Sequence, residues 1–374
     1  MKITDVQCMV LLDEYHKRDW VLVRVYTDSG FTGTGEAFPG GGVKEATLQM
    51  KPLLVGEDPL NVDKLVQKMI RRIVTGGAKI QAASGIEIAL WDIVGKYFNC
   101  PVYNLIGGKY RDRIRVYGDC HHGDSLDSIA RASQKVVEQG YTAFKFDVDH
   151  YYPPEYMLDS YNKHLVPAGI HHIVAIAKTV RETVGYDIEF GMDCHWSYNV
   201  TDAVAVMNEL EPYKLSWFED PVGPENIDAM LRVSERTKVP ILTGENLCGL
   251  AGFRELIIKQ AVDILAPDVA QAGGIWETRK IAALADAYYI PLAPHNICGP
   301  VACMASVQLC AAIPNFMLLE LHAERVPWYD DLLVRPKPIF DNGYIEVPTG
   351  AGLGIELNMR EAKKHLKEGE KPFD

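Results

Sequence analysis

The feature that most constrains the fold is a regular alternation of short apolar segments and helical segments after residue 113. The apolar segments lie at 114–120, 142–148, 187–194, 215–221, 239–246, 262–269, 290–296 and 317–323. Amphipathic stretches lie between them, for example at 125–138, 201–212, 225–236, 250–260 and 274–288. Parallel strands need helical crossovers, and a repeat of eight strand–helix units closes on itself. The sequence therefore predicts an α/β fold with a TIM-type barrel over residues 113–335.

The residues before the barrel follow a different pattern. Segments 2–12 and 20–28 alternate apolar and polar side chains as half-buried strands do, and the glycines at 33–37 mark a turn into a third strand. Helical periodicity then extends from about 44 to 105. This pattern predicts a separate α+β domain over residues 1–112.

The C-terminal residues leave the barrel pattern, so the sequence predicts a tail over residues 336–374. We expect the segments 344–348 and 350–354 to pack against the N-terminal part.

Charge and cysteine usage exclude several classes of partner. Acidic residues outnumber basic residues by 50 to 38, and the formal net charge of −12 repels phosphate backbones and anionic lipid surfaces. The eight cysteines are scattered without a CxxC pair, as is typical of reduced thiols. Neither a signal peptide nor an apolar stretch of membrane-spanning length is evident. We expect a cytoplasmic protein with no nucleic-acid or membrane partner.

Three acidic residues occur at the same position in consecutive strand–helix units. Asp193, Glu219 and Glu245 each follow an apolar segment, and successive members are 26 residues apart. The carboxyl ends of barrel strands meet at one mouth, where barrel enzymes carry their active sites. Three converging carboxylates repel each other unless a cation lies among them, and an all-oxygen set suits Mg²⁺. Helix caps or loop charges are the alternative, but the repeated spacing favours a Mg²⁺ site.

Two histidines lie beside acidic residues at the same strand ends. Asp268 and His295 end the sixth and seventh expected strands and could form a pair in which the carboxylate fixes the tautomer of the imidazole. His195 follows Asp193 by two residues and is expected on the same face. A lone histidine is more often a packing residue, but two at one barrel mouth favour acid–base chemistry.

Three further ionisable residues are expected at this mouth. Lys145 and Asp147 lie on the second strand, where alternation puts both side chains on one face. Glu320 ends the eighth strand.

Several motifs resemble the mandelate racemase/muconate lactonizing enzyme branch of the enolase superfamily. The segment ASGIEIALWD at 83–92, FEDP at 218–221, GE at 244–245 and PD at 267–268 carry the resemblance, which covers almost the whole chain. It implies a (β/α)7β barrel under an α+β capping domain that the C-terminal tail completes. It also implies one Mg²⁺ bound by the three acidic residues, and removal of a proton next to a carboxylate to give an enediolate.

The second barrel strand and the first metal-ligand position distinguish reactions within this family. Racemases and cycloisomerases typically carry Lys-x-Lys on that strand, but here the second position is Asp147, a weaker base. The Asp-x-His sequence at 193–195 is similar to galactonate and gluconate dehydratases. His195 could protonate a departing β-hydroxyl, which is a poor leaving group otherwise.

The resemblance also implies roles for the other residues at the mouth. His295, paired with Asp268, matches the histidine base of the family. Lys145 can hold or polarise the substrate carboxylate, and Glu320 matches an acid that contacts it. These roles imply a Mg²⁺-dependent acid-sugar dehydratase, a hydro-lyase that forms a 2-keto-3-deoxy sugar acid.

Other reactions stay open at this point. An acid-sugar epimerase, a lactone cycloisomerase and a non-catalytic sugar-acid binder are the alternatives. Aldonates, aldarates and uronates all remain candidate substrates, and we expect a homo-oligomer.

Two segments could complete the substrate site. The polar loop 13–19 carries His16 and Arg18, and the family fold would let it close over the sugar, although a solvated charged loop explains these residues equally. The insertion at 149–167, rich in Tyr, Pro and His, could add a wall.

Overall fold

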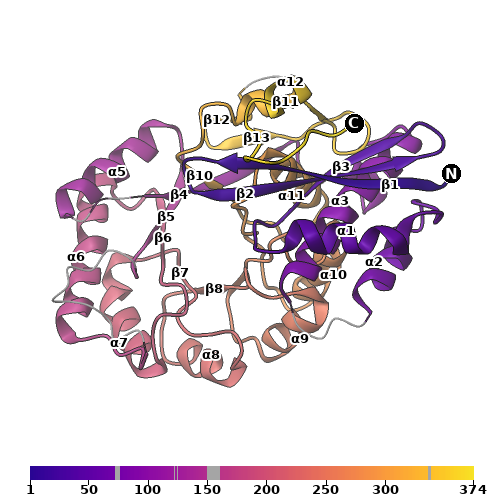
Figure 1. Cartoon of the computed structure of the whole chain (residues 1–374). Helices are drawn as coiled ribbons and strands as arrows, with labels where there is room; N and C mark the ends of the chain where they lie inside the picture. Colours follow the sequence, from indigo (N-terminus) through magenta and orange to yellow (C-terminus); the bar gives the residue numbers. More distant parts are fainter. Residues whose placement is uncertain (72–75, 122, 124, 150–160, 336–337) are drawn as a thin grey trace.

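A computed structural model describes residues 1–71, 76–121, 123, 125–149, 161–335 and 338–374 (Figure 1). Its N-terminal part contains a three-stranded antiparallel sheet followed by helices, as the sequence predicts. The strands are β1 (Ile3–Asp13), β2 (Arg18–Thr27) and β3 (Thr32–Ala37). The helices are α1 (Val43–Leu54), α2 (Val62–Ile70), α3 (Ala78–Tyr97) and α4 (Val102–Leu105).

Close packing of α3 on β3 depends on two glycines. A Cβ atom at Gly33 would lie 1.9 Å from the carbonyl oxygen of Ala89, and one at Gly35 would lie 2.1 Å from that of Gly85. Any larger residue would push the helix away from the sheet. The expected turn at 33–37 is wrong, because these residues lie within β3, where the two glycines set a helix–strand contact.

The barrel predicted after residue 113 is present. Its parallel strands are β4 (Arg113–Cys120), β5 (Ala143–Asp147), β6 (Glu189–Asp193), β7 (Trp217–Glu219), β8 (Ile241–Thr243), β9 (Ile264–Leu265) and β10 (Leu319–His322). The helices are α5 (Leu126–Glu138), α6 (Pro167–Val184), α7 (Val200–Leu210), α8 (Ile227–Ser234), α9 (Gly249–Lys259), α10 (Ile275–Asp286) and α11 (Pro300–Ala312). Figure 1 shows these helices around the outside of the strands.

Local sequence signals begin several of these helices. The side chains of Ser125, Asn199 and Asn226 accept backbone N–H bonds at the starts of α5, α7 and α8. Proline occupies the first turn of α6 and α11, where its missing N–H costs nothing.

The expected strand at 290–296, all of which is described, is not a regular strand. Its Leu292 forms single bridges to Leu265 and Phe316, and these close the barrel between β9 and β10. Pro291 and Pro294 lack the N–H group that a continuous ladder requires, which explains the irregular segment.

The C-terminal tail contacts both halves of the molecule. Residues 344–346 (β13, Tyr344–Glu346) pair antiparallel with the first barrel strand β4, so the expectation that they pack on the N-terminal part is wrong. They continue a pairing with β12 (Phe340–Asp341). The backbone N–H of Leu353 does reach that part and donates to Asp92 of α3. The domain boundaries at 112 and 335 stay a prediction.

Two short elements complete the tail around these contacts. Strand β11 (Leu333–Val334) pairs with β14 (Glu356–Leu357), and α12 (Met359–Ala362) follows. None of the helices in the described part of the chain combines the length and the apolar composition that a membrane crossing requires.

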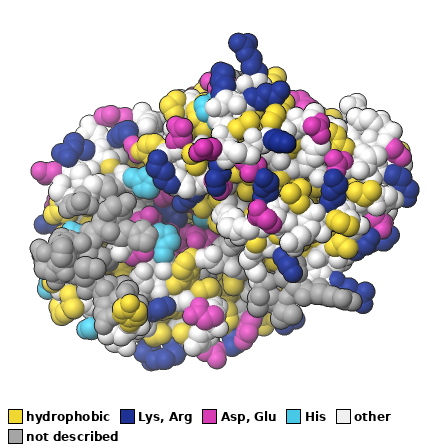
Figure 2. All heavy atoms as spheres, viewed as in Figure 1, with side chains coloured by type: hydrophobic (Ala, Val, Ile, Leu, Met, Phe, Trp, Pro, Cys, Tyr) yellow, Lys and Arg dark blue, Asp and Glu magenta, His cyan; other side chains and the backbone are white. Residues whose placement is uncertain are grey.

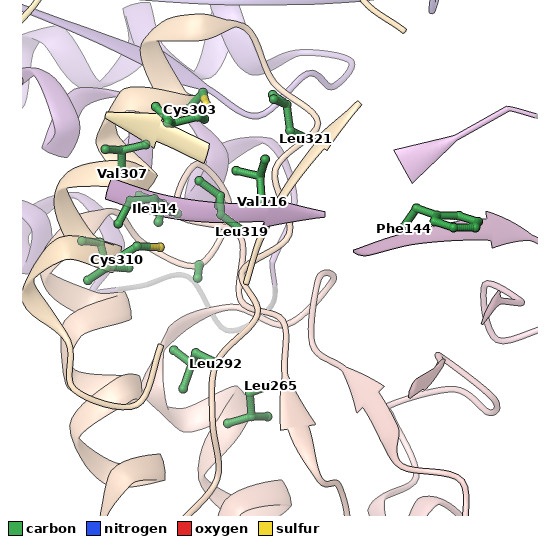
Figure 3. Close-up of a cluster of buried hydrophobic side chains, with 14 of the residues drawn as sticks. Ile114, Val116, Phe144, Leu265, Leu292, Cys303, Val307, Cys310, Leu319 and Leu321 are labelled. Atoms are coloured by element: carbon green, nitrogen blue, oxygen red, sulfur yellow. The ribbon is translucent and has the colours of Figure 1, made fainter. Parts of the chain in front are cut away.

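The largest apolar core lies between the barrel strands and the surrounding helices. Figure 3 shows side chains of β4 and β10 that point away from the barrel interior toward α11. Those on the strands are Ile114, Val116, Leu319 and Leu321, and those on the helix are Cys303, Val307 and Cys310. The alternate residues of the same strands face the interior, which is where the polar site lies.

Candidate active site at the barrel mouth

Asp193, Glu219 and Glu245 converge at the carboxyl ends of β6, β7 and β8. One carboxylate oxygen from each lies within 4.8 Å of the others, and Asp193 and Glu219 are direct neighbours in the sheet register. Asp193 and Glu219 are fully buried. Oε1 of Glu219 has no hydrogen-bond partner among the described residues. Three carboxylates with an unpartnered buried oxygen suit a hard divalent cation.

Lys145 of β5 lies among these acids. Its Nζ is 2.8 Å from Oδ2 of Asp193, 3.1 Å from Oε2 of Glu219 and 3.2 Å from Oε1 of Glu320. Burial lowers the pKa of Lys145, but these carboxylates outweigh it and raise the pKa well above its usual value. Burial and the charge of Asp193 raise the pKa of Glu219, and a bound cation would favour its ionised form.

His295 and Asp268 form the pair expected from the sequence. Nδ1 of His295 lies 2.7 Å from Oδ2 of Asp268, and its Nε2 lies 3.3 Å from Oε2 of Glu245. Burial lowers the pKa of His295, but the charges of Glu245 and Glu320 and the bond to Asp268 raise it to about 10. The ring therefore bonds Asp268 through Nδ1 and turns Nε2 toward the three carboxylates.

A turn after β6, and not the alternation of side chains along the strand, brings His195 to the site. It follows the end of β6 in the left-handed conformation, with φ of 42°, and Trp196 continues it with φ of 58°. Its backbone N–H donates to Oδ1 of Asp193, and its Nε2 lies 3.7 Å from Oδ2 of Asp193. Nδ1 lies 3.1 Å from Oδ1 of Asp149, an acidic partner that the sequence analysis did not single out.

The surrounding acids hold a proton on His195. Burial lowers the pKa of this ring, but the charge of Asp193 and the hydrogen bond to Asp149 raise it to about 11. Asp147 also belongs here, since its carboxylate lies within 4.8 Å of ligand atoms of Asp193 and His195. Burial and the charge of Asp119 raise the pKa of Asp147 well above its usual value.

Glu320 faces the same interior from β10. Its Oε2 accepts a hydrogen bond from the hydroxyl of Tyr117 at 3.1 Å and from the backbone N–H of Asn296 at 3.4 Å. Tyr117 is its direct partner in the β4–β10 register. Sequence alternation in β4 could have indicated Tyr117, because it lies on the interior face.

The expected loop at 13–19 is a turn between the ends of β1 and β2, and only 5% of the side chain of His16 is exposed. The ring of His16 stacks on His322 at 4.1 Å, and its Nδ1 lies 2.8 Å from Oδ2 of Asp13. Nη1 of Arg18 lies 2.8 Å from Nε2 of His322. His16 and Arg18 therefore contact other parts of the protein, and a role of this loop in substrate binding stays a prediction.

His322 links this turn to the barrel, and the sequence analysis missed it. It follows Glu320 by two residues on β10, and its Nδ1 lies 2.8 Å from Oδ2 of Asp119 on β4. Since arginine can only donate, Nε2 of His322 accepts from Arg18. The alternation of Glu320 and His322 on one strand is the signal that could have identified it.

Figure 2 shows histidine and acidic side chains gathered on the barrel face of the molecule. Residues 150–160 of the insertion expected at 149–167, including His150, Tyr151 and Tyr152, lie outside the described residues.

Two family models match separate parts of this chain. Residues 6–107 match the mandelate racemase/muconate lactonizing enzyme N-terminal domain, and residues 127–362 match the enolase C-terminal domain-like family. A D-xylonate dehydratase of Haloferax volcanii is 47% identical over 380 residues, covering 100% of this chain and 91% of that protein. A D-galactonate dehydratase of Verminephrobacter eiseniae is 33% identical over 349 residues, covering 91% of this chain and 89% of that protein.

The fold also matches solved structures. The crystal structure of a mandelate racemase/muconate lactonizing enzyme-like protein from Rubrobacter xylanophilus superposes with a TM-score of 0.93 at 38% identity, covering 100% of this chain and 99% of that one. Both halves of the chain and the arrangement of its barrel therefore agree with one family. The chain belongs to the mandelate racemase/muconate lactonizing enzyme family of the enolase superfamily.

Proposed function

We propose that this chain is a Mg²⁺-dependent acid-sugar dehydratase, a hydro-lyase that converts a sugar acid to a 2-keto-3-deoxy acid. One observation carries the proposal. Two histidines from different strand ends border the same carboxylate group, His295 beside Glu245 and His195 beside Asp193. Elimination of water needs one group to take a proton and another to give one, and this arrangement supplies both.

The named relatives support an aldonate substrate. The two described above are dehydratases of D-xylonate and of D-galactonate. Because the D-xylonate dehydratase shares 47% of its residues over the whole chain, D-xylonate is the first substrate to test.

The histidines divide the proton transfers. Once the charge of Glu245 is offset by a bound cation, the cause that most raises the pKa of His295 is removed and the ring can be neutral. Nε2 of the neutral ring then takes the proton from the carbon next to the substrate carboxylate, while Asp268 fixes the ring through Nδ1. The electrons of the broken C–H bond form a C=C bond, and the C–O bond to the β-hydroxyl breaks. His195 gives this hydroxyl a proton, so it leaves as water. The resulting enol becomes the 2-keto acid, and the reaction needs no oxidant or reductant.

The acids and Lys145 stabilise the charge that develops. Asp193, Glu219 and Glu245 would hold Mg²⁺, which when bound neutralises negative charge on the substrate carboxylate as the enediolate forms. We propose that Lys145 and Glu320 contact the substrate carboxylate, and that Lys145 does so through its ammonium group.

A product screen tests this proposal. The purified protein is incubated with D-xylonate, D-gluconate and D-galactonate in Mg²⁺, and 2-keto acid is measured with semicarbazide. We expect product from at least one acid, and none after chelation. Absence of product from every acid, with Mg²⁺ bound by elemental analysis, would overturn the dehydratase assignment, and a changed stereocentre without loss of water would indicate an epimerase.

A further inference from the structure

The interior of the barrel beneath the acidic residues is filled by a small cluster of buried side chains. Two are large aromatic residues, Tyr117 on β4 and Trp217 on β7, and most of the others are small or aliphatic. The buried members are Tyr117, Ala143, Trp217, Leu242, Ile264, Ala266, Ala293 and Leu318. The two aromatic rings meet edge to face, with centroids 5.1 Å apart and an interplanar angle of 67°.

Trp217 fits in this interior because its neighbour on β6 has no side chain. Gly191 is the direct partner of Trp217 in the β6–β7 register. A Cβ atom at Gly191 would lie 2.1 Å from Cε2 of the indole and 2.4 Å from its Nε1. Since a contact this close is impossible, the position of the indole depends on Gly191.

The polar end of Trp217 contacts one proposed metal ligand. Its Nε1–H donates to Oε2 of Glu219 at 3.3 Å, and the two residues share one face of β7. Nζ of Lys145 lies 3.1 Å from the same oxygen. Oε1, the other oxygen of Glu219, is buried with no hydrogen-bond partner among the described residues.

We infer that Trp217 is a positioning residue of the metal site, which holds Oε2 of Glu219 and leaves Oε1 for the cation. A carboxylate that is fixed through one oxygen loses less freedom when the other binds a metal. Gly191 contributes to the same arrangement, because its missing side chain leaves space for the indole of Trp217. This inference rests on the proposed metal site.

Tyr117 supplies a matched control. It lies in the same cluster and is also fully buried, but its hydroxyl donates to Glu320, which is outside the proposed ligand set. Replacement of either aromatic residue by phenylalanine removes one donor and keeps an aromatic ring. Only the Trp217 change removes a bond to a proposed ligand.

The test measures Mg²⁺ binding by calorimetry, without substrate, in the wild type, Trp217→Phe, Tyr117→Phe and Glu219→Gln, with thermal unfolding in EDTA as the folding control. Loss of a hydrogen-bond partner of a metal ligand typically weakens binding by about 10–100-fold, and we expect this for Trp217→Phe. Tyr117→Phe should bind as the wild type does. Equal binding by Trp217→Phe and the wild type would overturn the inference alone, whereas no binding by the wild type would overturn the proposed metal site.

A second measurement serves if Trp217→Phe does not fold. The chain has six tryptophans, and ¹⁵N labelling resolves their indole N–H signals by NMR. Trp196 follows His195, so the Trp196→Phe variant identifies its signal and distinguishes it from that of Trp217. We expect Mg²⁺ to shift one indole signal that this variant retains. We also expect Glu219→Gln to shift the same signal in the absence of metal. An indole spectrum that Glu219→Gln leaves unchanged would contradict the inference.

Discussion

Nζ of Lys145 lies 2.8 Å from Oδ2 of Asp193, and both side chains are buried at the barrel mouth. The same nitrogen lies within 3.2 Å of Glu219 and Glu320. Lys145 therefore compensates the charge of two residues that we propose as metal ligands. A divalent cation and Lys145 would stabilise the same group of buried acids.

This shared role predicts that metal offsets the loss of Lys145. Lys145→Met leaves buried acids uncompensated and should lower the free energy of unfolding by about 3–5 kcal/mol in EDTA. Saturating Mg²⁺ should reduce this loss. Urea unfolding with and without Mg²⁺ measures the difference.

Lys238→Met is the control, because Lys238 pairs with Glu211 at the surface and such pairs contribute about 0–1 kcal/mol. The same loss for Lys145→Met in EDTA and in Mg²⁺ would show that the lysine and the metal act on different charges.

Glu219→Gln should prevent metal binding and dehydration together. The change removes one negative charge and replaces one carboxylate oxygen by an amide nitrogen, which is a donor and not a metal ligand, while it keeps the size of the side chain. Chelation of the wild type should have the same effect on the rate. A chelated protein that contains no metal by elemental analysis and keeps its full dehydration rate would rule out the assigned site.

Arg18→Gln should weaken substrate binding more than it slows the chemical step. Arg18 contacts His322, which follows Glu320 by two residues on β10, and we propose that its charge also contacts the bound sugar acid. A hydrogen bond to a charged group contributes about 1.5–3 kcal/mol, so KM should rise roughly 10–100-fold while kcat changes little. Steady-state kinetics with D-xylonate separates the two. A fall in kcat with unchanged KM would place Arg18 in the chemical step instead.

Glu87 predicts a pH dependence of stability. Its carboxylate on α3 accepts the N–H groups of Ile275 and Trp276 at the start of α10, and burial raises its pKa to about 8 from 4.5. Above pH 4.5 the unfolded chain releases this proton and the folded chain keeps it. The contribution of this proton to the free energy of unfolding is therefore complete below about pH 4.5 and is lost as the pH rises toward 8.

Glu87→Gln removes this titration. The difference between the free energies of unfolding of the wild type and this variant should therefore decrease by about 1.4 kcal/mol per pH unit between pH 5 and 7. Urea unfolding of both proteins across this range checks it, and a constant difference would show that Glu87 ionises alike in the folded and unfolded chains.

Parallel-strand geometry made much of the barrel site predictable. Acids that recur at 26-residue spacing after apolar segments had to meet, because the carboxyl ends of consecutive barrel strands point to one mouth. The same reasoning brought together His295 and Asp268. It required only the order of the strands.

Features that depend on turn conformation or on distant partners could not be predicted in this way. The left-handed turn at His195 carries its ring to the site after the strand has ended. The pairing of 344–346 with β4 joins residues far apart in the sequence, and no local pattern indicates it. In the sequence, Asp119 and His322 are each indistinguishable from other strand residues. They become neighbours only because β4 and β10 pair when the barrel closes.

The division of proton transfers between His195 and His295 is tested most directly by ¹H NMR of the substrate in D₂O with metal-loaded enzyme. His195→Asn should still exchange the α-proton for deuterium but form no 2-keto product, since the base remains and the acid is lost. His295→Asn should lose both by on the order of 10²–10⁴ in rate, because removal of the proton comes first. Exchange at the wild-type rate in His295→Asn would contradict the assignment of His295 as the base.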